Sequence, residues 1–284
     1  MSAFDPIFED IDINLCEPDA RPALEAFLSL FGTSRLSLTH IYAAMDFVWD
    51  MVGADNQNPS SEQLASFYSH PVWLMNGLFI EKHAESLRYR KIFADWISLR
   101  EPERIVDFGG GYGTLARIIS TCCPSASVEI VDPFPRAELI SACRSYNNLS
   151  VVNEVSGQYD ILIATDVFEH VVDPLDLLFN LSRCVRMGGW MLLANHFAPT
   201  IKCHLPRNFH FRDSWDFFMK TAGFEVVERV AYGSAYRKIA DAELSRGIRR
   251  WEALSAQSYN VAMRGVGLGR VRQVVLRELN RRGR

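Results

Sequence analysis

The 284-residue chain lacks any apolar run close to the roughly 20 residues that a membrane-spanning helix requires. The stretch Met1 to Asp5 also lacks the basic region followed by an apolar one that marks a secretory leader. Hydrophobic residues make up 48% and charged residues 23% of the chain, a composition that supports a full core. We therefore expect a cytoplasmic protein with no membrane partner.

The six cysteines lack both the paired C-x-x-C spacing of a zinc site and the density of a disulfide scaffold. His196, Cys203, His204 and His210 are conceivable metal ligands, but their spacing is irregular and no second paired motif accompanies them. The sequence therefore predicts reduced, mostly structural cysteines and no bound metal.

Basic residues are absent from positions 1–20, which hold six acids, whereas positions 237–284 hold twelve bases and four acids. The basic tail lacks a regular interleaving of bases with aromatic residues, and it contains no nucleic-acid motif. It is better explained as a solvated helical face or a contact in a homo-oligomer. A nucleic-acid partner is not expected.

Positions 21 to about 100 carry helical patterns almost throughout and no clear strand. One apolar face is formed by residues at helical spacing: Tyr89, Ile92, Phe93, Trp96 and Ile97. The segment Gly53 to Ser60 is rich in turn formers and predicts a loop. We expect a helical cap over residues 1–100.

After Glu103 short apolar runs alternate with helical patterns, which predicts a parallel sheet flanked by helices. The expected strands are 104–108, 128–131, 151–152, 161–164, 190–194 and 224–230, followed by a hairpin partner near 235–239. A helix starting at Asp173 and Pro174 is expected to bury Val185 and end at Gly188-Gly189, and Ser214 is expected to cap another. Residues 241–284 read as a helical extension.

A glycine-rich segment, Asp107-Phe-Gly-Gly-Gly-Tyr-Gly113, lies between an apolar strand and a helix, where the backbone can approach a nucleotide-like ligand. The dinucleotide fingerprint G-x-G-x-x-G/A fails, because Thr114 stands where the third small residue belongs. The acid Asp107 suits an ammonium and would repel pyrophosphate. Asp132, at the end of the next strand and twenty-three residues after Gly109, can accept hydrogen bonds from ribose hydroxyls.

The segment D-x-G-x-G-x-G from Asp107 resembles class I S-adenosylmethionine-dependent methyltransferases. Asp166-Val-Phe-Glu-His170-Val-Val-Asp-Pro and Met187-Gly-Gly resemble segments of the ubiquinone-biosynthesis type. The resemblance covers residues 103 to about 230. It implies an α/β fold, a Rossmann-like seven-stranded methyltransferase sheet, over residues 101–240, with the N-terminal helical cap and the C-terminal helical extension added.

The resemblance also implies how S-adenosylmethionine is held. Asp107 and the glycines would hold the methionine end, Asp132 the ribose, and Asn153 or Glu154 the adenine amino group. Phe134 could pack on the adenine, and Asp166 could line the pocket near the methionine. The implied cofactor site is Asp107, Gly109, Gly110, Gly111, Gly113, Asp132, Phe134, Asn153, Glu154 and Asp166.

Methyl transfer from a sulfonium requires mainly an aligned nucleophile and, where needed, a base. Histidines follow strand ends at positions 170 and 196, and His210 lies in the next loop; His196 is the first candidate for the base. The loop Lys202 to Arg212 combines cations with aromatic rings and would suit an anionic acceptor. Asp166-Val-Phe-Glu does not match the [DN]-P-P-[YF] pattern of nucleobase amino methylation.

The sequence thus predicts methylation of a small molecule, with a hydroxyl of a biosynthetic intermediate favoured over nitrogen or carbon. Two alternatives remain open. One is a catalytically idle S-adenosylmethionine-binding protein with an assembly or regulatory role, and the other is a nicotinamide-dependent oxidoreductase.

Overall fold

The computed structural model describes residues 8–10, 18, 20–30, 32 and 35–263. These residues form two compact units, each described here by itself. Unit 1 contains the described residues up to Glu154 together with Thr200–Cys203. Unit 2 contains Val155–Pro199 and the described residues from His204 onward. None of the described helices is long and apolar enough to cross a membrane.

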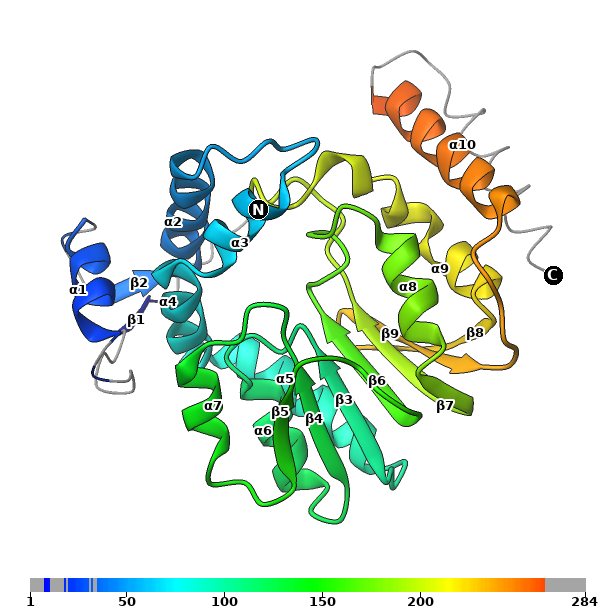
Figure 1. Cartoon of the computed structure of the whole chain (residues 1–284), viewed down its shortest axis with the longest axis horizontal. Helices are drawn as coiled ribbons and strands as arrows, with labels where there is room; N and C mark the ends of the chain where they lie inside the picture. The colour runs from blue at the N-terminus through cyan, green and yellow to red at the C-terminus, as the bar shows by residue number, and fades with distance from the viewer. Residues whose placement is uncertain (1–7, 11–17, 19, 31, 33–34, 264–284) are drawn as a thin grey trace, which may run out of the picture. The chain divides into compact units, whose positions relative to one another are not determined.

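Unit 1 contains most of the helices of the expected cap and the first strands of the main sheet (Figure 1). Its elements are β1 (Phe8–Asp10), α1 (Arg21–Ser29), β2 (Arg35–Ser37), α2 (Leu38–Met51), α3 (Ser61–Tyr68), α4 (Pro71–Ile80), α5 (Ala84–Ser98), β3 (Arg104–Phe108), α6 (Thr114–Cys122), β4 (Ser127–Val131), α7 (Ala137–Cys143) and β5 (Leu149–Val152).

Unit 2 contains the remaining strands of the main sheet and the C-terminal helices. Its elements are β6 (Tyr159–Thr165), α8 (Pro174–Ser182), β7 (Val185–Ala194), a 3₁₀ turn (Pro206–Asn208), α9 (Phe211–Thr221), β8 (Phe224–Val230), β9 (Gly233–Lys238) and α10 (Arg246–Met263).

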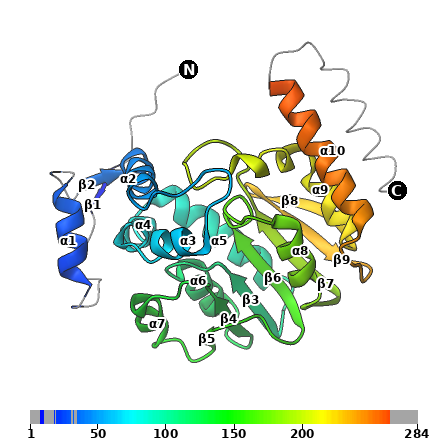
Figure 2. The ribbon, with the colours of Figure 1, turned by 45° about the horizontal axis from the view of Figure 1, so that its top comes forward.

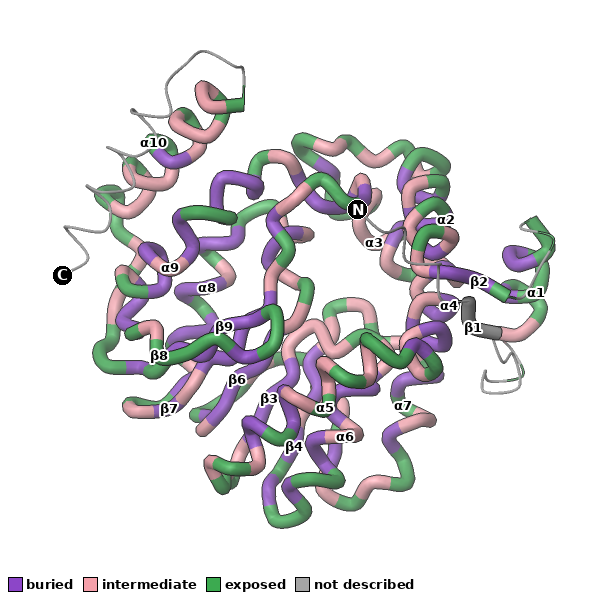
Figure 3. Tube along the Cα trace, turned by 180° about the vertical axis from the view of Figure 1, so that it is seen from behind, coloured by how far each residue is buried: buried purple, intermediate pink, exposed green. Residues whose placement is uncertain are grey.

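Seven strands form one mixed sheet in the order β5-β4-β3-β6-β7-β9-β8. The pairs β3/β4, β4/β5 and β6/β7 are parallel, whereas β9 pairs antiparallel with both β7 and β8. The apolar run Ile161–Ala164 is buried, as expected for a strand covered on both faces. Most residues of β3 and β4 are buried as well (Figure 3). The expected fold class is confirmed.

The cap helices of unit 1 pack through apolar faces, and α2 lies against α4 (Figure 2). Trp49 on α2 is buried, and its indole N–H donates to Asn56 Oδ1 at 2.5 Å. The loop expected from Gly53 to Ser60 joins α2 to α3, as predicted. The expectation of no strand in this region was wrong, because Arg35–Ser37 forms β2 and pairs with β1. Three residues are too short to produce a periodic signal.

Two helix boundaries differ from the prediction. Helix α8 starts as expected, since the Asp173 side chain accepts a hydrogen bond from Asp176 N at 2.9 Å. It ends at Ser182, however, and Val185 begins β7, which continues through Gly188-Gly189. Ser214 does not cap α9, which begins at Phe211; its hydroxyl donates to the His210 carbonyl oxygen at 2.9 Å inside the helix.

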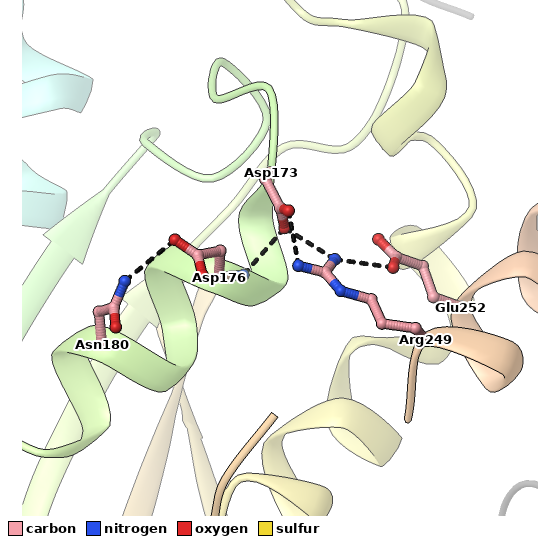
Figure 4. A network of polar contacts seen from close by, with 5 residues as sticks. All are labelled: Asp173, Asp176, Asn180, Arg249 and Glu252. Carbon is pink, nitrogen blue, oxygen red and sulfur yellow. Dashed lines mark hydrogen bonds and ion pairs between the residues drawn. The ribbon is translucent and has the colours of Figure 1, made fainter. Parts of the chain in front are cut away.

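Helix α10, the described part of the basic extension, is tied to the start of α8 by one ion pair. Arg249 donates from both terminal nitrogens to the two carboxylate oxygens of Asp173, at 2.9 and 2.6 Å, and also contacts Glu252 (Figure 4). A bidentate pair fixes orientation as well as distance. Part of the expected basic face thus has an internal partner, and residues 264–284 lie outside the described residues.

The close approach of α4 to the glycine-rich segment generates a stability prediction. A Cβ on Gly77 would lie 2.6 Å from Tyr112 Cβ, whereas one on Gly247 in α10 would meet nothing nearer than 3.5 Å. We expect Gly77→Ala to lower the free energy of unfolding by about 1 to 3 kcal/mol through overpacking. Gly247→Ala should raise it by roughly 0.5 to 1 kcal/mol. Urea unfolding measures both, and equal effects of the two substitutions would contradict the prediction.

Candidate functional site

The glycine-rich segment of unit 1 joins the end of β3 to the start of α6. Gly109 N donates to the Val131 carbonyl oxygen at 2.7 Å, which holds the segment beside the end of β4. Gly113, the N-cap of α6, has φ +76°, and a Cβ there would lie 2.7 Å from Leu139 Cδ1. Only glycine fits this turn without strain. The absence of a side chain at Gly113 therefore lets the chain turn directly from the glycine-rich segment into α6.

Asp107, on β3, is buried with 1% of its surface exposed. Neither of its carboxylate oxygens accepts a hydrogen bond within ordinary geometric limits from the described part of the chain. Burial raises the pKa of Asp107 to about 7, while the charge of Arg90 and the amide of Ala116 act in the opposite direction. A buried acid with two unused oxygens fits the ammonium group of a ligand.

Asp132 follows β4 and contacts the backbone of the glycine-rich segment. Its Oδ2 accepts from Gly111 N at 2.9 Å and its Oδ1 from Phe134 N at 2.8 Å. Burial raises the pKa of Asp132, and these two backbone N–H groups oppose the shift. The structure therefore brings together Asp107, the glycines and Asp132, as the sequence predicted.

The cap helices contact this segment directly. On α4, the Glu81 carboxylate accepts from Thr114 Oγ1 and from Arg117 Nη2, the latter at 2.5 Å, which fixes the first turn of α6. The Phe134 ring stacks on Tyr68 with centroids 5.2 Å apart and planes at 14°. One face of Phe134 is thus covered by a residue of α3. Asn153 and Glu154 follow β5 and are exposed.

In unit 2, Asp166 follows β6 in a left-handed conformation, with φ +54°. Its backbone N donates to the Ala194 carbonyl oxygen at 2.7 Å, and its Oδ2 accepts from Tyr232 Oη at 2.9 Å. The parallel pairing of β6 with β7 places Thr165 opposite Ala194. Asp166 therefore lies at the carboxyl edge of these strands, where open α/β sheets bind ligands.

Glu169, three residues later, is fully buried, and sequence analysis missed it as a site residue. Its Oε1 accepts from His196 N at 2.7 Å, while Oε2 has no hydrogen-bond partner among the described residues. Burial, together with the neighbouring charge of Asp166, raises the pKa of Glu169 well above its usual value. Its place in the motif with Asp166 and His170 was a signal that the sequence already contained.

Three histidine rings lie around Glu169. The His204 ring contacts His170 at a centroid distance of 4.7 Å and His196 at 5.8 Å. His204 Nδ1 lies 2.8 Å from the Ala198 carbonyl oxygen, so it carries the proton and leaves Nε2 as the acceptor. Burial lowers the pKa of His204 to about 4, which keeps the ring neutral. We call Glu169, His170, His196 and His204 the histidine cluster.

Three members of the histidine cluster can also bind a metal ion. Ligand atoms of Glu169, His170 and His204 all lie within 4.8 Å of one another. Two imidazoles and a carboxylate suit first-row transition metals. Of the four residues considered from the sequence as ligands, only His204 belongs to this group, because irregular spacing along the chain conceals residues that folding brings together.

Two further expected residues have other contacts in the structure. His210 Nδ1 lies 3.0 Å from Ser255 Oγ on α10, and burial lowers the pKa of His210 to about 4. Lys202, from the loop expected to bind an anion, forms an ion pair with Asp50 and donates its backbone N–H to Asp46 at 2.6 Å. The structure therefore gives His210 a packing contact with α10 and already pairs the Lys202 charge.

The fold and the glycine-rich segment define a class I S-adenosylmethionine-dependent methyltransferase. The sequence matches the family described as methyltransferase domain over residues 81–229, slightly more than half of the chain, and the protein belongs to that family. The chain is 24% identical over 227 residues to the ubiquinone biosynthesis O-methyltransferase of Thiobacillus denitrificans, covering 72% of this chain and 89% of that one. It is 26% identical over 151 residues to the trans-aconitate 2-methyltransferase of Mycolicibacterium gilvum, covering 50% and 58%.

The solved structure of an O-methyltransferase family protein from Burkholderia thailandensis has a TM-score of 0.53 and 14% identity, covering 79% of this chain and 85% of that one. At this identity the similarity concerns the fold. The expected methyltransferase class, enzyme and cofactor are confirmed, and a nicotinamide oxidoreductase is excluded by the family.

The unpartnered Asp107 carboxyl generates a pH-dependent prediction. Its pKa is about 7 in the folded chain against 3.8 as the ordinary value, so the folded state holds its proton more tightly. Stability is therefore lost as pH rises between these values, and the loss is complete above about pH 7. We therefore expect the free energy of unfolding of Asp107→Asn, relative to that of the parent, to rise by about 2 kcal/mol between about pH 5 and about pH 8.

Urea unfolding of the cofactor-free protein at the two pH values measures this gain. Asp95→Asn, at an exposed site on α5, is the control and should show no pH-dependent difference. A constant difference between Asp107→Asn and the parent at both pH values would contradict the prediction.

Proposed function

We propose that the protein transfers the methyl group of S-adenosylmethionine to a hydroxyl group of a small biosynthetic intermediate. The observation that carries the proposal is the histidine cluster at the carboxyl edge of β6 and β7. There the neutral imidazole of His204 lies beside the rings of His170 and His196, and Glu169 keeps one oxygen without a hydrogen-bond partner among the described residues. A hydroxyl acceptor needs a base, whereas many stronger nucleophiles do not. The similarity to an enzyme named as an O-methyltransferase supports the same choice.

The residues of unit 1 fit the cofactor. Asp107 would hold the ammonium group of the methionine part, since its buried oxygens have no hydrogen-bond partner in the portion of the chain that the structure describes. Asp132 would accept from the ribose hydroxyls, and Asn153 or Glu154 would contact the adenine amino group. Phe134 would pack on the adenine with the face that Tyr68 does not cover. When bound, the cofactor supplies a methyl group on a sulfonium centre that leaves as a thioether.

In unit 2, Asp166 would line the methionine end of the pocket, and the histidine cluster would receive the acceptor's proton. His196 is the candidate that can reach an incoming molecule, because its side chain is exposed while its backbone is fixed by Glu169. His204 is neutral and buried beside it, so it does not add a repelling charge when His196 becomes protonated.

The acceptor can be anionic, although the structure reduces the cations expected for it. Lys202 is paired with Asp50, and the charge of Arg207 acts on Asp173, so both cations already have an acidic neighbour. The similarity to an enzyme named for trans-aconitate is compatible with an acidic acceptor. A second role for the same cluster is metal binding by Glu169, His170 and His204, which would favour the ionised form of a hydroxyl.

The assignment of Asp132 generates a binding prediction. Asp132→Ala should weaken S-adenosylmethionine binding by about 1 to 3 kcal/mol, because two charge-assisted hydrogen bonds to the ribose are lost. Isothermal titration calorimetry measures the effect. Asp55→Ala is a matched control, since Asp55 Oδ1 accepts from Gln57 N at 2.7 Å just as Asp132 Oδ1 accepts from Phe134 N. Equal affinities of Asp132→Ala and the parent would remove Asp132 from the cofactor site.

The assignment of the base generates a kinetic prediction. His196→Ala should lower the methylation rate by about 10²-fold or more, with cofactor affinity unchanged. Glu169→Gln keeps the shape of the side chain and should lower the rate by roughly 10-fold, since the carboxyl group next to the imidazoles is lost. Formation of S-adenosylhomocysteine with a panel of hydroxylated metabolites, followed by mass spectrometry of the methylated product, measures the rates.

A chelator separates the two roles of the cluster. Unchanged turnover after treatment with EDTA supports the imidazole base, whereas lost turnover that Zn²⁺ or Mn²⁺ restores supports the metal. A His196→Ala rate within a few-fold of the parent would exclude His196 as the base. Cofactor binding without turnover of any metabolite would favour an idle binding protein.

A further inference from the structure

One hydrogen bond in unit 2 joins a residue with strained backbone to a residue that directly follows another such residue. Tyr232 Oη donates to Asp166 Oδ2 at 2.9 Å. Asp166 itself has φ +54°, and Ala231, which precedes the tyrosine, has φ +50°. Among the described non-glycine residues, only Glu101 shares this left-handed conformation. Such conformations persist where the surrounding structure imposes them, and they gather at functional sites.

The strain at Ala231 follows from the hairpin that contains it. Val230 pairs with Gly233, so the loop between β8 and β9 consists of Ala231 and Tyr232 alone. A positive φ at the first residue of a two-residue loop is the position where glycine is normally found. Alanine carries a steric cost there that glycine would avoid. The strand pairing on both sides of the loop imposes this conformation on Ala231, and the turn then sets the position of Tyr232.

The topology of the sheet brings this turn to the edge where ligands bind. β9 runs antiparallel to β7 with Leu193 opposite Ser234, so the hairpin loop lies next to the carboxyl end of β7. The contact is tight, because a Cβ on Gly233 would lie 2.8 Å from the Leu193 carbonyl oxygen and 3.0 Å from Ala194 Cβ. Ala194 also accepts the Asp166 backbone hydrogen bond. The same strand end therefore locates both partners of the Tyr232–Asp166 bond.

Fold stability does not account for this arrangement. Asp166 is exposed and 41% of the Tyr232 surface is exposed, so a hydrogen bond between them is strongly screened by water. A bond of this kind adds little to stability, although it does restrict the direction of the carboxylate. Direction matters where an acid faces a ligand, because electrostatic stabilisation depends on groups that are already oriented.

We propose that Tyr232 is a positioning residue, which holds the Asp166 carboxylate in the orientation that S-adenosylmethionine requires. The inference rests on the proposed role of Asp166 at the methionine end of the cofactor. It adds a residue from the β8–β9 hairpin, outside the motifs of the glycine-rich segment and of Asp166 to Pro174. Tyr232 acts on the ligand only through Asp166.

A double-mutant cycle on cofactor binding tests the proposal without needing an acceptor. Isothermal titration calorimetry gives the dissociation constant of S-adenosylmethionine for the parent, Tyr232→Phe, Asp166→Asn and the double variant. We expect Tyr232→Phe to raise the dissociation constant about 3- to 10-fold and Asp166→Asn to raise the dissociation constant at least as much. The double variant should bind no more weakly than Asp166→Asn, because the phenol acts only through the carboxylate.

Tyr236→Phe is the matched control. It removes a bond of the same kind from the same hairpin, since Tyr236 Oη donates to Asp216 Oδ1 at 2.8 Å. It should leave cofactor affinity unchanged in both the parent and the Asp166→Asn background. Thermal melts of all variants report whether each is folded.

Three outcomes would overturn the inference: an unchanged affinity in Tyr232→Phe, effects of the two substitutions that multiply, or an equal loss in Tyr236→Phe. An unchanged affinity in Asp166→Asn would overturn it together with the proposed role of Asp166. Failure of the proposed hydroxyl methylation would instead appear as absence of turnover with cofactor binding and the cycle intact.

Discussion

A buried carboxyl group that keeps at least one oxygen without a hydrogen-bond partner in the described part of the chain is the constraint around which each unit is organised. Asp107 in unit 1 and Glu169 in unit 2 are both buried and both keep at least one oxygen without a partner among the described residues. Burial raises the pKa of each, so the cofactor-free protein favours their neutral forms. Such groups cost stability, and buried acids with a strongly raised pKa are typical of functional sites.

The surrounding structure fixes these acids through contacts that lie far apart in the sequence. In unit 1, α4 holds the start of α6 through Glu81 and approaches Tyr112 so closely that Gly77 has no room for a side chain. In unit 2, the Glu169 carbonyl oxygen accepts from Leu205 N at 3.0 Å and from Asn208 Nδ2 at 3.2 Å. The helical cap therefore supports the surroundings of Asp107 in unit 1, and the loop after β7 supports Glu169 in unit 2.

The sequence predicted the strands from Arg104 to Phe108 and from Phe224 to Val230 with their observed bounds, because alternation and turn residues act locally. The site around Asp107 was predictable for the same reason. The histidine cluster was only partly predictable. His204 contacts His170 because the chain folds back after β7, and no local sequence pattern predicts that contact. The sequence predicted a helix at Val185, because one apolar residue fits the spacing of a helix as well as that of a strand. Its assignment to β7 follows from pairing within the sheet.

The charges of the protein and of its cofactor complement each other through proton release. S-adenosylmethionine carries positive charge on its sulfonium and ammonium groups, and a neutral Asp107 would leave the ammonium without a counterion in a buried place. In the proposed cofactor site, the ammonium charge beside Asp107 would favour the ionised carboxylate and lower its pKa, against the desolvation that raises it in the cofactor-free fold. The proposed contact would thereby offset part of the stability that burial of this acid costs, and cofactor binding would stabilise the fold.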